Sequence, residues 1–131
     1  QSVVLSSESE SAQIFFTLDG SRPGTSSSQY IDPILMDQTT VLKARAFEPG
    51  LLPGEILTAT YFINEPSHLP TISLIAEPPT LWDSEIGIYE NEYKQREIPV
   101  TVEYYTPDGL PGFKINAGSR LGGFNIWTKT Q

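Results

Sequence analysis

The 131-residue sequence predicts an all-β protein, with a small antiparallel β-sandwich followed by a smaller β-rich unit. Three observations lead to this prediction. Runs of apolar, aromatic and β-branched residues are short and are separated by turns about every ten residues. The chain holds 10 glycines and 11 prolines, which interrupt helices and mark turns. No window shows the apolar repeat of an amphipathic helix.

Strands in the first half are recognised by alternating apolar and polar residues. We expect strands at residues 12–18, 39–47 and 57–64, with shorter apolar runs at 3–5 and 30–36. The polar residues 25–29 are expected to form a loop. A turn is expected over Asp19–Gly24, because glycine adopts positive φ readily and aspartate hydrogen-bonds to the backbone that follows it.

The second of these strands has the clearest two-residue period. Its small and apolar residues Leu42, Ala44 and Ala46 are expected to face a core. Lys43 and Arg45 alternate with them and are therefore expected to face water.

A proline-containing segment divides the chain. Glu65–Pro70 has two prolines, which stiffen the backbone and favour an extended linker. We therefore predict a domain at 1–64, a linker at 65–70 and a second domain at 71–131. Strands of the second half are expected at residues 71–77, 98–106 and 112–121, with one helical turn at 81–85 and a hairpin turn at 106–109.

Composition excludes several classes of function. With 16 acidic and 8 basic residues the chain has a net charge of −8, so binding to nucleic acid or to an anionic membrane is not expected. No apolar run is long enough to span a membrane, so membrane insertion is not expected either. The absence of cysteine excludes disulfides and thiolate sites. The chain begins at Gln1 without a signal peptide, and we expect it to be a piece of a longer protein.

No group of residues predicts a catalytic site, a metal site or a cofactor. The carboxylate pairs Asp83 with Glu85 and Glu90 with Glu92 lie two residues apart, whereas glycoside hydrolysis needs carboxyl groups roughly 5–10 Å apart across a cleft. Asp83 is better explained as a cap at a turn. His68 is the only histidine, and we expect it to be exposed in the linker.

Exposed aromatic side chains are the alternative source of function, because flat rings can stack on sugars. Trp82 and Tyr89 are the candidates for carbohydrate binding. Further aromatic residues of the second half are Tyr93, Tyr104, Tyr105 and Trp127. The competing interpretation is that Trp82 and alternate tyrosines fill the core of the second half. We favour it because Trp82 lies in an apolar-flanked turn.

The first half resembles a known family. Its motifs are IxFTxDGSxP over residues 14–23, YxxPI over 30–34, TTVLKARAF over 39–47 and TxTYFI over 58–63. They are similar to the immunoglobulin-like domain at the C-terminus of chitobiases and β-hexosaminidases, over about residues 1–64. This resemblance implies an immunoglobulin-like β-sandwich and an accessory role, since the domain recurs in many secreted bacterial proteins.

The second half resembles another family. Its motifs are LPxISL over residues 69–74, LWDxExGIY over 81–89, PVxVEYYxPDG over 99–109 and NAGxRLxG over 116–123. They are similar to the opening segment of the spore-coat CotH family, which has an atypical kinase-like fold. The resemblance implies that Arg120 and Lys129 lie near a nucleotide. A kinase also needs a base and metal-binding carboxylates, and most of that region would follow Gln131.

The function we expect is a non-catalytic accessory or spacer module of a larger secreted or cell-surface bacterial protein. It would act outside the cell, with the neighbouring domains of that protein as partners. One alternative is a carbohydrate-binding module that contacts a polysaccharide. Another is the N-terminal fragment of a CotH-like nucleotide-binding kinase. An unpaired strand edge within residues 112–131 also predicts a homodimer.

Overall fold

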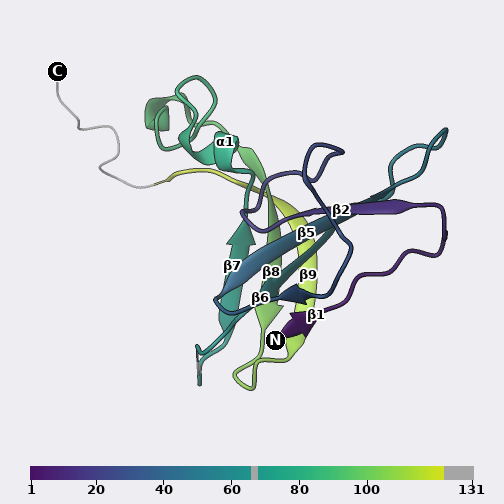
Figure 1. The fold of residues 1–131 in the computed structure, drawn as a ribbon. Helices are drawn as coiled ribbons and strands as arrows, with labels where there is room; N and C mark the ends of the chain where they lie inside the picture. Colours follow the sequence, from purple (N-terminus) through teal and green to yellow (C-terminus); the bar gives the residue numbers. More distant parts are fainter. Residues whose placement is uncertain (66–67, 123–131) are drawn as a thin grey trace. The chain divides into compact units, whose positions relative to one another are not determined.

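The computed structural model describes residues 1–65 and 68–122. The chain divides into two compact units, Gln1–Pro66 and Ser67–Gln131. Figure 1 shows that β-strands make up most of the regular structure in these residues, alongside one short α-helix and one 3-10 turn. The predicted all-β fold class is confirmed. No helix in this part of the chain is both long and apolar enough to cross a membrane.

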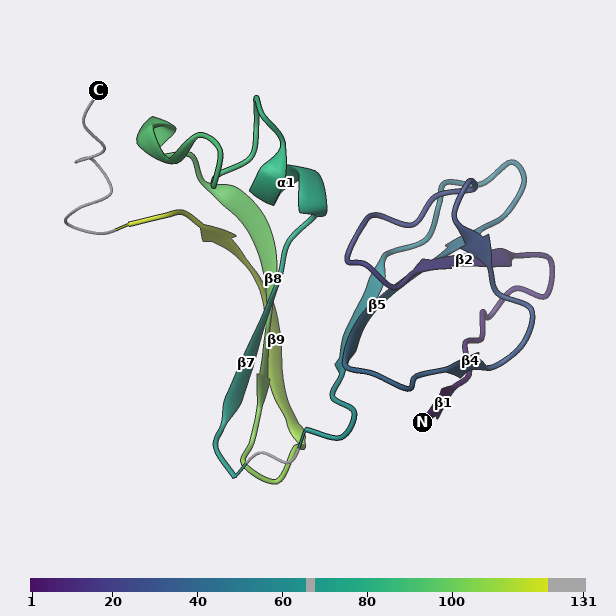
Figure 2. The same cartoon turned by 60° about the vertical axis from the view of Figure 1, so that its left-hand side comes forward.

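The first unit contains two antiparallel sheets. Its strands are β1 (Ser2–Val3), β2 (Gln13–Thr17), β3 (Ser28–Gln29), β4 (Ile34–Leu35), β5 (Thr40–Phe47) and β6 (Leu57–Tyr61). One sheet has the order β3-β2-β5-β6 and the other is the pair β1-β4 (Figure 2). The expectation that residues 25–29 form only a loop is wrong, because β3 pairs Gln29 with Phe15 and Ser28 with Phe16 of β2.

Apolar side chains from both sheets form the core of the first unit. Val3 of β1 and Ile34 of β4 cluster with Leu42 of β5 and with Met36. Leu42 is fully buried, as its place in the alternating pattern predicts. Burial of one such side chain contributes about 1.5–3 kcal/mol. These contacts between the sheets make the first unit a sandwich.

Lys43 does not face water, and the prediction that it does is wrong. Its side chain points to the sheet face opposite Leu42, as alternation requires, yet it is only 7 % exposed. Lys43 Nζ donates a hydrogen bond of 2.7 Å to the carbonyl oxygen of Gly20. Arg45 lies on the same face and is half-buried, and its Nε donates to the carbonyl oxygen of Gly54 at 2.6 Å. Both cations therefore donate hydrogen bonds to backbone carbonyl oxygens of loops that lie against this face.

The loop that Lys43 holds is also tied to itself. Asp19 accepts hydrogen bonds at Oδ1 from the backbone N–H of Ser21 at 2.9 Å and from the Ser21 hydroxyl. Thr17 Oγ1 donates to the Ser21 carbonyl oxygen at 2.7 Å. Gly20 has a φ of 79°, and Pro23 is fully buried. The TxDGSxP motif therefore encodes a fixed loop.

The second unit is built on one antiparallel sheet. It contains β7 (Thr71–Ile75), α1 (Pro78–Trp82), the 3-10 turn η1 (Glu92–Lys94), β8 (Ile98–Tyr105) and β9 (Pro111–Ser119), and the sheet order is β7-β8-β9. The predicted hairpin turn joins β8 to β9, with the Gly109 N–H donating to the Thr106 carbonyl oxygen at 2.8 Å. Gly109 has the positive φ, 76°, that this turn requires.

A small core covers one end of one face of this sheet. Ile98 and Val100 of β8 are buried against Ile88, which lies in the segment between α1 and β8. Figure 2 shows α1 at the same end of the sheet. The opposite face carries an ion pair, in which Lys114 Nζ lies 3.6 Å from the carboxylate of the buried Glu103. The two faces of the sheet therefore differ in chemistry.

Replacement of Lys43 by methionine tests the loop attachment. Lys43→Met keeps an unbranched side chain but leaves the Gly20 carbonyl oxygen without this donor. We expect the free energy of unfolding of the first unit to fall by about 1–3 kcal/mol, measured by urea denaturation. The control is Arg22→Met, which removes one positive charge from an exposed position of the same loop and should change stability by less than about 0.5 kcal/mol. Equal effects of the two variants would contradict this account.

Candidate functional site

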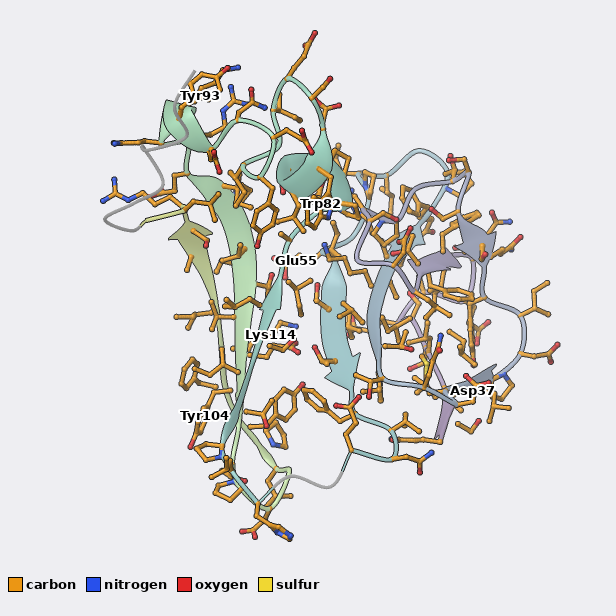
Figure 3. The ribbon with its side chains drawn as sticks, turned by 90° about the vertical axis from the view of Figure 1, so that its left-hand side faces the viewer. Asp37, Glu55, Trp82, Tyr93, Tyr104 and Lys114 are labelled. Atoms are coloured by element: carbon orange, nitrogen blue, oxygen red, sulfur yellow. The ribbon has the colours of Figure 1, made fainter. Side chains whose placement is uncertain are left out.

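The two residues proposed from sequence to contact a sugar lie against each other in the second unit. The ring centroids of Trp82 and Tyr89 are 4.5 Å apart, and the ring planes differ by 23°. Trp82 is 61 % exposed and Tyr89 is 47 % exposed. The favoured expectation that Trp82 fills the core is therefore wrong. Trp82 is the last residue of α1, the helix that carries its side chain in Figure 3.

Trp82 is positioned by α1, which begins earlier than the helical turn predicted at 81–85. Pro78 and Pro79 occupy its first turn, where a missing N–H costs nothing and the fixed φ suits a helix. Asp83 then adopts an extended conformation and ends the helix. Leu81 packs against the core cluster, so its neighbour Trp82 points away from that cluster to the surface.

Tyr89 is positioned by backbone hydrogen bonds to α1. The N–H of Ile88 donates to the Thr80 carbonyl oxygen at 2.9 Å, and the N–H of Tyr89 donates to the Leu81 carbonyl oxygen at 3.1 Å. Ile88 is buried in the core, which anchors this part of the loop. The stacking of Tyr89 on Trp82 thus follows from the way the loop returns to the helix.

Asp83 stabilises the turn between the two rings. Its Oδ1 accepts hydrogen bonds from the backbone N–H of Glu85 at 2.8 Å and of Ile86 at 3.0 Å. These bonds to Glu85 and Ile86 hold the pKa of the Asp83 carboxyl below its usual value. The predicted role of Asp83 as a cap at a turn is confirmed.

Asn91 and Gly87 complete the loop. The sequence analysis did not single out Asn91, and it included Gly87 only within the LWDxExGIY motif. Asn91 is 4 % exposed, and its Nδ2 donates to the carbonyl oxygens of Ser84 and Gly87, at 3.0 Å each. A Cβ atom on Gly87 would lie 2.6 Å from the backbone N and O of Asp83. Asn91 lies among charged residues in the sequence, and nothing in that pattern distinguishes it from an exposed loop residue.

The exposed rings of Trp82 and Tyr89 lie beside a segment rich in acidic residues. Segment 83–92 contains four carboxylates and no basic residue; they belong to Asp83, Glu85, Glu90 and Glu92. Carboxylates accept hydrogen bonds from hydroxyl or ammonium groups and repel anions. The arrangement therefore suits a neutral or cationic ligand with a flat apolar face, held by stacking on the outer faces of the rings.

The other aromatic candidates are not part of this pair. Tyr93 is 65 % exposed on η1. Tyr104 stacks on Phe113, with ring centroids 5.3 Å apart. The Tyr105 hydroxyl donates to the Glu103 carboxylate at 3.0 Å. Trp127 lies outside the described residues.

The remaining candidates do not form a second site. Arg120 is exposed directly after β9, while its proposed companion Lys129 lies outside the described residues. His68 is exposed, as predicted. Within residues 1–65 and 68–122, no three histidine, aspartate or glutamate side chains are grouped in a way that would hold a metal ion.

Comparison with known proteins finds one similarity, and it lies in the first unit. Residues 1–58 match the family model of the chitobiase/beta-hexosaminidase C-terminal domain. This part of the resemblance seen in the sequence is confirmed, and the match ends before the second unit begins. Neither the curated proteins nor the solved structures include a significant match to the chain.

Replacement of Gly87 by alanine tests whether the loop fixes the aromatic pair. The added methyl group meets backbone atoms, so the loop must shift. We expect Gly87→Ala to change the near-ultraviolet circular dichroism of the stacked rings and to destabilise the second unit by about 1–3 kcal/mol. Gly122→Ala is the control, because a Cβ there has no neighbour within 4 Å. Unchanged ring signals in Gly87→Ala would show that the loop does not hold the pair.

Proposed function

We propose that the chain is a non-catalytic accessory module of a larger secreted or cell-surface bacterial protein. The observation that carries this proposal is the match of residues 1–58 to the chitobiase/beta-hexosaminidase C-terminal domain. By its name that family is a terminal domain of glycosidases, and the resemblance noted in the sequence implies an accessory role for it.

The chemistry of the first unit supports the same proposal. The polar groups of its most specific motif bind one another and the backbone: Asp19 accepts from Ser21, and Thr17 donates to the Ser21 carbonyl oxygen. The hydrogen bonds from the side chain and backbone of Ser21 hold the pKa of Asp19 below its usual value. A carboxylate with a lowered pKa is a poor general acid near neutral pH. The motif therefore stabilises a loop rather than supplying reactive groups.

For the second unit we propose the finer assignment that the sequence motifs suggest, the opening strands of a CotH-like region. The spacing of the sequence motifs supports this assignment, and the family match does not extend to this unit. Arg120 and Lys129 would then contact a nucleotide in a region completed by further sequence. Within this proposal the present chain is the accessory part that precedes the catalytic groups.

An assay for turnover by the purified chain tests the accessory role. We expect no product from chitooligosaccharides, aryl glycosides or ATP with Mg²⁺, followed by mass spectrometry over long incubation. Asp83→Asn and Arg120→Ala serve as matched variants, since a trace activity from a contaminant would be the same in both. Turnover that either variant abolishes would overturn the proposal.

A second candidate function is carbohydrate binding by Trp82 and Tyr89. The observation that favours it is the stacked and exposed pair on a loop held by Asp83, Asn91 and Gly87. A preformed site loses little conformational entropy on binding, which favours affinity. The surrounding carboxylates favour neutral or amino sugars over sugars that carry acid groups.

Tryptophan fluorescence tests this second function. In a Trp127→Phe background Trp82 is the sole tryptophan, because the chain has two. We expect a saturable change with neutral or cationic oligosaccharides and none with uronic acid oligomers. Trp82→Ala should abolish binding measured by calorimetry, whereas Tyr93→Ala, which removes an equally exposed ring from η1, should retain it. Absence of binding to every sugar, or binding that survives Trp82→Ala, would exclude the pair as a sugar site.

A further inference from the structure

The stacking of Trp82 on Tyr89 limits the kind of ligand that the pair can take. The ring centroids lie 4.5 Å apart and the ring planes differ by 23°, so each ring covers one face of the other. A ligand therefore has access to the outer face of each ring and to the ring edges. The exposed fractions of the two side chains, 61 % for Trp82 and 47 % for Tyr89, agree with one covered face and one open face on each ring.

The outer faces of two stacked, nearly parallel rings point in opposite directions. Successive sugars of an extended chain can stack on two rings only where both rings face the same way, side by side along the chain. A chain that lies on the outer face of Trp82 has Tyr89 behind the indole, on the side away from the chain. The pair is therefore one stacking platform and not two.

The loop keeps the two rings in this arrangement. The N–H of Tyr89 donates to the carbonyl oxygen of Leu81, the residue before Trp82, at 3.1 Å. The buried Asn91 donates to the carbonyl oxygen of Gly87, which has no space for a side chain. These contacts fix the backbone that carries Tyr89 against α1. Parting the rings to admit a ligand between them would require a side chain to give up the stacking contact itself.

The other exposed rings among residues 68–122 do not extend this platform. They are those of Tyr93 and Phe113. The Lys94 ammonium lies over the Tyr93 ring, 5.7 Å from its centroid, and Figure 3 shows Tyr93 apart from Trp82. Phe113 follows closely after the β8-β9 turn, which lies at the end of the sheet opposite to α1 (Figure 2). A sugar chain on the pair thus finds no second ring beside it in this part of the chain.

We propose that the pair binds one sugar ring at a time, with the apolar face of the sugar on the outer face of Trp82 and with Tyr89 as the support behind the indole. Trp82 takes this role because its ring is the larger and the more exposed of the two. The ligand class is a single sugar unit without an acid group, since Glu85 and Glu90 are exposed on the same loop and repel anions. This inference rests on the proposed carbohydrate binding and deepens it.

Titration of the Trp82 indole N–H signal by nitrogen-15 NMR tests the proposal, with the full chain in a Trp127→Phe background. The ligands are glucose, glucosamine and N-acetylglucosamine, each as the monosaccharide and as β-1,4-linked oligomers of increasing length. We expect the association constant per chain to rise no faster than the number of sugar units, because each chain is held at one unit. A second platform would raise it by roughly tenfold or more, since the second contact becomes intramolecular.

Tyr89→Phe and Tyr93→Ala are the matched variants. Tyr89→Phe keeps the supporting ring and should bind as the parent does; loss of binding would assign the sugar to the Tyr89 hydroxyl and overturn the role of Trp82. Tyr93→Ala should leave the dependence on chain length unchanged. An affinity that climbs steeply with chain length would overturn the single platform while carbohydrate binding stands. No binding of any of these sugars would exclude carbohydrate binding itself, and this inference with it. Circular dichroism confirms the fold of each variant.

Discussion

The hydrogen bond from the buried Lys43 ammonium to the Gly20 carbonyl oxygen is the interaction on which the first unit depends. A buried charge is costly unless it is hydrogen-bonded, so Lys43 requires the 19–24 loop in one position. The loop in turn is fixed by Asp19, Ser21 and Thr17, and its Pro23 is fully buried. Strand β5 thus contributes to both faces of its sheet. Leu42 packs in the sandwich core on one face, and Lys43 binds the 19–24 loop on the other.

In the second unit, too, hydrogen bonds between side chains and the backbone fix a loop. Its loop between α1 and β8 is held by the buried Asn91, by the cap at Asp83 and by a glycine whose neighbours leave no space for a side chain. Here the fixed loop presents rings outward instead of covering a sheet. The sheet itself carries apolar side chains that are more than half exposed, those of Ile72, Leu74 and Ile115.

Alternation of residue types was enough to predict the all-β class, the strand β5 and the β8-β9 hairpin, because these depend on local pattern and turn chemistry. It also assigned Lys43 correctly to the face opposite Leu42. It did not predict that Lys43 is buried, because alternation separates two faces without indicating that a loop returns to cover one of them.

The same limit applies to Trp82, whose apolar neighbour Leu81 enters the core while Trp82 does not. The burial of Asn91 could not be predicted from the sequence. Its partners are the backbone oxygens of Ser84 and Gly87, which any residue type at those positions would provide.

The most direct test of the central claim is nitrogen-15 NMR of the lysine ammonium groups in the intact chain. A buried ammonium held by a carbonyl oxygen exchanges its protons slowly, as protected groups do. We therefore predict a resolved Lys43 Nζ signal near neutral pH, with a contact to Gly20, while the exposed Lys94 exchanges too quickly to be seen. A Lys43 ammonium that exchanges as fast as that of Lys94 would contradict the account, because the loop would then lack its attachment to β5.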